Sequence, residues 1–282
     1  MEKLENLLHR WIKQIEQVLS ESEQIRREAD DVGPSAELSY WKSRMSRFNN
    51  LLEQMKTKKV TDVITILHFA KSRSLRKWRE LDSRITDAAN EAKDNVKYLY
   101  TLDKFFGPLS KCNPVDMIEH IPSLINAIRM IHSISQYYNS SERMTSLFVK
   151  VTNQMITTCK HFMYEGVSKI WDLGREELAK RISHCKRLNE EYEFCFHKTK
   201  KKLQEDSTEK QFEFSENYIF GKFEAFCKRL DKINNLQNIL ESYSLLQTFK
   251  IEGIDSIVVR YKSINDIIKK KTYDILDHRK SE

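Results

Sequence analysis

Hydrophobic residues recur along most of this chain at alternating spacings of three and four positions. The first such series has six apolar members out of seven: Leu4, Leu8, Trp11, Ile15, Val18, Ser22 and Ile25. The same spacing returns over residues 38–55, 75–99, 144–162 and 219–240. It places the apolar side chains on one face of a helix, which must then be buried against another element. No segment alternates apolar and polar residues over a comparable length, so the pattern predicts helices and no sheet.

Glycine and proline are scarce and fall between these segments. The 282 residues include 6 Gly and 4 Pro, where average usage would give about 12% of the chain. We expect breaks near residues 30–35, 106–122, 139–142 and 204–212. Gly33-Pro34 separates the first two helices, with Ser35 as a candidate N-cap, and Gly107-Pro108 is expected to end a long helix.

Long helices joined by short breaks predict an all-α fold, namely an elongated multi-helix bundle or an α-solenoid-like rod. We expect residues 1–282 to form a single helical region of this kind. Residues 254–261 have a locally β-like composition, but they are too few to build a sheet.

The charge pattern leaves two interpretations open. Lys and Arg number 48 against 41 Asp and Glu, a net charge of +7. The basic runs are His197, Lys198, Lys200, Lys201 and Lys202, followed later by Lys269, Lys270 and Lys271. Interspersed charges of both signs are typical of a solvated helix surface. The alternative is a basic helical-bundle module that binds anionic membranes or cytoskeletal filaments.

Motifs for catalysis, cofactors or metals are missing from the sequence. Gly221-Lys222 is followed by Phe223, so it lacks the Ser or Thr and the upstream Gly of a phosphate-binding loop. His184-Cys185 with Cys195 and His197 does not have the spacing of a zinc finger, and we interpret the thiols as core residues. The five cysteines have no disulfide-scaffold spacing, which indicates a reducing compartment. The N-terminus lacks a signal peptide, and no apolar run approaches the ~18 residues of a membrane span. We therefore expect no catalytic, cofactor-binding or metal-binding residues.

Several aromatic residues fall outside the helical registers. They either pack against third helices or belong to a partner surface, since aromatics are enriched in interface cores. These residues are Tyr40, Tyr98, Tyr100, Tyr137, Tyr138, Phe194 and Tyr218.

Three strings in the sequence resemble one known family. The first is GPSAELSYWKSR at residues 33–44, the second begins WRELDSRI at residue 78 and continues through residue 99, and the third begins FSENYIFGKF at residue 214. In order and spacing they resemble the N-terminal tail of dynein heavy chains, and are closer to axonemal heavy chains, those of the outer arm included, than to cytoplasmic ones. The residues that match the tail pattern are Gly33, Pro34, Glu37, Trp41, Arg44, Trp78, Asp94, Phe220, Gly221 and Phe223.

The resemblance implies a scaffold and not an enzyme. In that family the rod-like tail joins heavy chains to one another and carries intermediate and light chains, so these chains are the expected partners. The family's motor region, with its ATP-binding residues, has no counterpart in these 282 residues. The implied location is the cytoskeleton, within a dynein complex of the ciliary axoneme. The matching residues are expected to be structural, as a helix start, a turn and core anchors.

Overall fold

The computed structural model describes residues 1–27, 33–111, 113–205, 210–245, 248–249, 251–270 and 275–277. The chain divides into two compact units. Unit 1 comprises Met1–Phe106 and Ile128–Lys150, and unit 2 comprises Gly107–Ala127 and Val151–Glu282.

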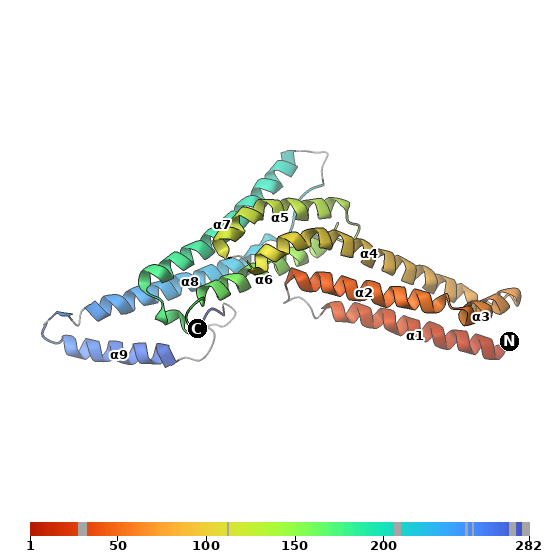
Figure 1. Cartoon of the computed structure of the whole chain (residues 1–282), viewed down its shortest axis with the longest axis horizontal. Coiled ribbons are helices and arrows are strands. Elements are labelled where there is room, and N and C mark those ends of the chain that lie inside the picture. Colours follow the sequence, from red (N-terminus) through yellow and green to blue (C-terminus); the bar gives the residue numbers. More distant parts are fainter. Residues whose placement is uncertain are drawn as a thin grey trace. The chain divides into compact units, whose positions relative to one another are not determined.

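The described residues form α-helices and one short 3-10 helix, and no strand occurs among them, so the all-α prediction is confirmed (Figure 1). Unit 1 begins with α1 (Glu2–Arg27), α2 (Pro34–Met55) and α3 (Lys58–Phe69). The long α4 (Leu75–Lys111), α5 (Pro114–Ile134) and α6 (Ser141–Met163) each contribute residues to both units. Unit 2 adds η1 (Ile170–Asp172), α7 (Arg175–Glu205), α8 (Glu216–Leu245) and α9 (Ile254–Lys270).

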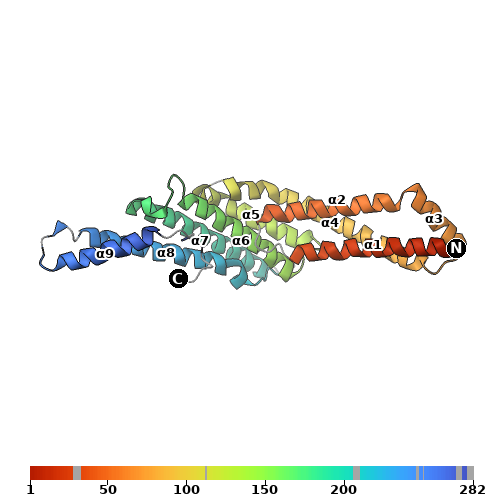
Figure 2. The same cartoon turned by 90° about the horizontal axis from the view of Figure 1, so that it is seen from below.

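In unit 1, α1 and α2 lie side by side (Figures 1 and 2). The buried stripe of α1 consists of Leu8, Ile12, Ile15 and Leu19. It packs in one core with side chains from α2, α3 and the first half of α4, including Phe48, Met55, Leu67, Leu75 and Ile85. Full burial of a Leu, Ile or Phe side chain contributes about 1.5–3 kcal/mol, so this shared core stabilises helices whose surfaces are otherwise strongly charged.

In unit 2, α7 and α8 pack along each other and enclose an aromatic cluster. The centroid of the Phe220 ring lies 5.2 Å from that of Tyr192 and 5.1 Å from that of Phe196. Phe212 and Phe214, from the segment that precedes α8, complete the cluster. The next helix, α9, packs on α8, where Tyr243 and Tyr261 stack at 6.1 Å.

Two prolines from the region in which a break was expected, residues 106–122, lie inside helices. α4 continues through Gly107 and Pro108 to Lys111, and α5 contains Pro122. A proline removes one backbone hydrogen bond from a helix. The flanking residues Phe106, Leu109, Ile121 and Leu124 are buried, and their burial offsets that loss. The predicted helix end at Gly107-Pro108 is therefore wrong.

One segment of β-like composition is helical, and one further expectation, the N-cap of α2, differs from the structure. The segment with β-like composition at 254–261 is the first half of α9, because its Ile254, Val258 and Tyr261 fall on one helical face that turns toward α8. The N-cap of α2 is Gly33, without a side-chain cap bond, and not Ser35. Of the expected breaks, residues 28–32 and 206–209 lie outside the described part of the chain.

Candidate functional site

The sequence at the start of α2 brings an acidic residue into the interior of unit 1. Gly33 caps the helix with extended backbone angles (φ −73°, ψ 173°), and Pro34 occupies the first helical turn. Proline fits there because its fixed φ is helical and the missing N–H has no intrahelical partner at this position. Glu37 follows in the same turn, where the helix dipole favours a negative charge. It is only 8% exposed.

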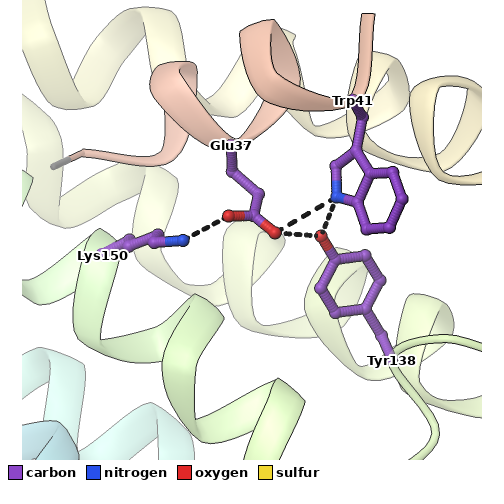
Figure 3. A network of polar contacts seen from close by, with 4 residues as sticks. All are labelled: Glu37, Trp41, Tyr138 and Lys150. Atoms are coloured by element: carbon purple, nitrogen blue, oxygen red, sulfur yellow. Dashed lines mark hydrogen bonds and ion pairs between the residues drawn. The ribbon is translucent and has the colours of Figure 1, made fainter. Parts of the chain in front are cut away.

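Glu37 joins three segments of unit 1 through one carboxylate (Figure 3). Its Oε2 forms an ion pair with Lys150 Nζ of α6. Its Oε1 accepts a hydrogen bond from the Tyr138 hydroxyl at 2.7 Å, in the connection between α5 and α6. The single N–H of the Trp41 indole lies 3.2 Å from the same Oε1 and 2.9 Å from the Tyr138 oxygen. Both carboxylate oxygens therefore have partners within the protein.

The electrostatics of Glu37 favour the charged form. Burial alone would raise the pKa of this carboxyl, but the Lys150 ammonium and the hydrogen bonds from Tyr138 and Trp41 outweigh it and hold the pKa below its ordinary value. Lys150 is 7% exposed, so each charge depends on the other for compensation. The two charged groups face each other, and the arrangement fixes the relative position of α2 and α6.

Arg44 extends the same face of α2 toward α1. Its Nη1 donates to the Ser22 hydroxyl at 2.7 Å and approaches the Ser22 carbonyl oxygen at 3.4 Å. The guanidinium lies over the ring of Phe48 at 4.8 Å and near that of Trp41 at 5.8 Å. Glu37, Trp41, Arg44 and Phe48 are spaced as successive turns of one helical face, so a single stripe of α2 contacts the other elements of unit 1.

Tyr138 is held in place by a second layer of polar contacts. The Ser135 hydroxyl accepts hydrogen bonds from the backbone N–H groups of Tyr137 and Tyr138 at 3.1 and 3.0 Å. It also lies 3.5 Å from Oδ1 of the buried Asn95 of α4. The Tyr137 ring meets the Trp41 indole edge-on, with centroids 4.7 Å apart. This connection therefore presents two tyrosines to α2 in a defined geometry.

The other residues of the family pattern do not belong to this cluster. Trp78 of α4 contacts Trp11 of α1 at 6.3 Å between ring centroids, and both line an apolar groove of about 310 Å³ in unit 1. Asp94 is exposed on α4. Phe220 and Phe223 are buried in unit 2. Gly221, between them, has open space where a Cβ would lie.

The aromatic residues that fall outside the helical registers divide into buried or half-buried and exposed ones. Tyr137 and Tyr138 are buried, and Tyr40 and Tyr98 are half-buried. Tyr100, Phe194 and Tyr218 are exposed on α4, α7 and α8. No spacing in the sequence connects Tyr138 or Lys150 with Glu37. They lie 101 and 113 residues away along the chain, and neither belongs to the registers from which the helices were predicted.

The thiols of unit 2 lie in its interior. Burial, together with the neighbouring Cys185 and Cys227, raises the pKa of the Cys159 thiol well above its ordinary value. Burial likewise raises the pKa of Cys227 to about 12 and that of Cys195 to about 11. Thiols with such pKa values stay protonated and unreactive near neutral pH. Cys112 lies outside the described residues.

The two basic runs, and the candidates for metal binding and membrane insertion, remain to be located in the structure. Lys200 of the first basic run pairs with Glu216 at 2.6 Å, while Lys201 and Lys202 are exposed. In the second run, Lys271 and the side chain of Lys269 lie outside the described part of the chain. Within that part, no three His, Cys, Asp or Glu side chains are grouped so as to hold a metal ion, and no helix is long and apolar enough to cross a bilayer.

Comparison with known proteins decides the family. The family model for dynein heavy chain, N-terminal region 1, matches residues 1–282. The chain belongs to the dynein heavy chain family. It is 53% identical over 283 residues to dynein axonemal heavy chain 5 of Rattus norvegicus and 54% identical over 281 residues to dynein axonemal heavy chain 8 of Mus musculus. The dynein gamma chain of the flagellar outer arm of Chlamydomonas reinhardtii is 36% identical over 282 residues.

These matches cover nearly all of this chain and a small part of each relative. They span 99–100% of the present residues but only 6–8% of the three heavy chains. The predicted resemblance to an axonemal dynein heavy-chain tail is thereby confirmed. The 282 residues correspond to the N-terminal region of such a heavy chain.

Proposed function

We propose that this dynein heavy-chain segment is a non-catalytic scaffold of an axonemal dynein tail. It takes part in heavy-chain association and in the binding of intermediate and light chains, within the ciliary axoneme. The observation that carries the proposal is the match of the whole chain to N-terminal region 1, with 53–54% identity to axonemal heavy chains.

The polar cluster of unit 1 supports a structural role for the family-pattern residues of α2. The helix starts at Gly33 and Pro34. It contacts α6 through Glu37, the α5–α6 connection through Trp41, and α1 through Arg44. A scaffold that carries load between partners needs helices that keep their relative positions. A buried ion pair with directed hydrogen bonds can supply such specificity, because a shifted helix would strand a charge in the interior.

Co-extraction from axonemes tests the assignment in the organism. A tag on this protein at its own locus should release with high salt from isolated axonemes and co-sediment with dynein intermediate chains in a sucrose gradient. A tagged protein that stays in the cell body fraction, or that sediments apart from every dynein subunit, would overturn the proposal.

A nucleotide assay tests the non-catalytic part separately. The purified 282-residue chain should show no ATP hydrolysis above a buffer blank. Hydrolysis that persists through repeated purification, and that is lost on heat unfolding of the chain, would show that the segment has an active site of its own.

A further inference from the structure

The connection between α3 and α4 in unit 1 combines exposed apolar side chains with positive charge. Phe69, the last residue of α3, is 81% exposed, and Ile66, one turn earlier, is 49% exposed. The other apolar residues of α3, including Val60, Val63 and Leu67, pack into the core of unit 1. Aromatic and arginine side chains are enriched in protein interfaces.

The sequence around Phe69 is basic, and one carboxylate from another helix, that of Glu5 in α1, also lies at this loop. Residues 63–79 contain no Asp or Glu, and their basic side chains are all exposed: Lys71, Arg73, Arg76, Lys77 and Arg79. Arg76 pairs with Glu80 at 3.0 Å, so the charge of Arg76 is offset by that carboxylate. This short stretch of sequence contains five basic residues and no acidic one, whereas the net charge of all 282 residues is only +7.

The backbone holds this loop in a defined shape. Lys71 has a φ of 54°, in the left-handed region that favours glycine. The N–H of Ser72 bonds to the Leu67 carbonyl at 3.1 Å and that of Lys71 to the His68 carbonyl at 3.0 Å, which is the closing motif of a helix C-terminus. The Ser72 hydroxyl also donates to Glu5 of α1 at 2.5 Å. A backbone fixed in this way loses little conformational entropy on binding.

We propose that Ile66, Phe69, Lys71, Arg73 and Lys77, here named the α3–α4 surface, bind an acidic peptide segment that carries an apolar side chain. The positive rim selects an acidic partner by charge complementarity, and the Ile66–Phe69 pair requires an apolar group to cover it. A lipid surface is less suited, because the remaining apolar face of α3 is committed to the core and only two apolar side chains could insert. The inference rests on the proposed scaffold function and names the chemistry of one partner.

Fluorescence anisotropy with synthetic peptides tests the proposal on the 282-residue chain. The probe is a fluorescein-labelled peptide of Glu and Asp with a central Leu-Phe pair, and its control has Ser-Ser in place of that pair. We expect the control peptide to bind about tenfold more weakly. R73E/K77E should weaken binding of the probe about tenfold or more, with the difference shrinking at high salt. F69S should reduce affinity for the Leu-Phe peptide and leave affinity for the Ser-Ser peptide unchanged.

Two matched variants distinguish binding at this surface from the effect of overall charge and from the effect of stability. K201E/K202E reverses two exposed lysines on α7 and should leave binding within about twofold of wild type. K71G should raise the urea midpoint by about 0.5 M, because glycine relieves the left-handed backbone, and should nevertheless weaken binding. Stability and affinity then change in opposite directions, which a merely structural role would not produce.

Three outcomes would overturn the proposal. The first is equal affinity for the Leu-Phe and Ser-Ser peptides, and the second is equal weakening by K201E/K202E and R73E/K77E. The third is binding to phosphatidylserine vesicles that F69S abolishes while the peptide does not bind, which would assign the surface to a membrane. Because the probe is not a dynein subunit, its failure leaves co-sedimentation with intermediate chains standing, and the converse also holds.

Discussion

Replacing Glu37 by glutamine removes one charge from the interior of unit 1 and leaves almost the same shape. The amide carbonyl of the new side chain could still accept a hydrogen bond from Tyr138, but the Lys150 ammonium, 7% exposed, would lose its counter-charge. Removing one partner of a buried pair costs about 3–5 kcal/mol. Since the hydrogen-bond acceptor is retained, we expect the lower end, about 3 kcal/mol, for E37Q.

Urea unfolding followed by tryptophan fluorescence measures this loss of stability in unit 1. Trp11, Trp41 and Trp78 belong to unit 1 and Trp171 to unit 2, so indole fluorescence reports mainly on unit 1. With a slope of about 2 kcal/mol per M, a loss of about 3 kcal/mol lowers the urea midpoint by about 1.5 M. The E37Q/K150M double variant removes the stranded ammonium and should recover about 2 kcal/mol of that loss.

The pH dependence of the free energy of unfolding gives an independent check that the charged form of Glu37 stabilises the fold. The pKa of Glu37 is lowered in the folded protein, so its contribution is fully present above the ordinary pKa near 4.5 and is lost as the pH falls through the folded value. The gap between wild type and E37Q should therefore be full at neutral pH and shrink in acid. A loss for E37Q below about 0.5 kcal/mol at pH 7, or a gap that grows in acid, would refute the buried ion pair.

Further predictions concern single sites. Trp41→Ala should cost about 3–5 kcal/mol, since the fully buried indole leaves a cavity; an unchanged melting temperature would contradict its place in the core. Gly221→Ala should stabilise unit 2 by about 1 kcal/mol, because its Cβ would meet no atom within 4 Å in a helix interior; a lower melting temperature would show that the helix requires glycine there. Cys159 and Cys227 should resist iodoacetamide at pH 8 in the folded chain and react in urea; peptide mass spectrometry showing modification of native protein would argue against their burial.

The helices of this chain were predictable because they follow from local periodicity. The stripes at 38–55 and 75–99 coincide with α2 and with most of α4. The errors arose where burial in the folded protein overrides the local conformational preference of a residue. Pro108 and Pro122 are helix breakers in isolation, but buried neighbours on both sides keep α4 and α5 continuous.

The polar cluster was only half predictable. Glu37 and Trp41 were singled out by the family pattern, whereas their partners come from distant segments that no spacing rule connects to α2. Lys150 lies among buried positions of α6, where a lysine would ordinarily be assigned to the solvent face. Finding it required the three-dimensional packing of α6 against α2.

Affinity capture tests the central claim most directly. The tagged 282-residue chain, shown to be helical by circular dichroism, is incubated with ciliary extract beside a tag-only control, and bound proteins are quantified by mass spectrometry. The scaffold account predicts enrichment of dynein intermediate chains or heavy chains that survives moderate salt. A folded bait that recovers no dynein subunit above the control would contradict it.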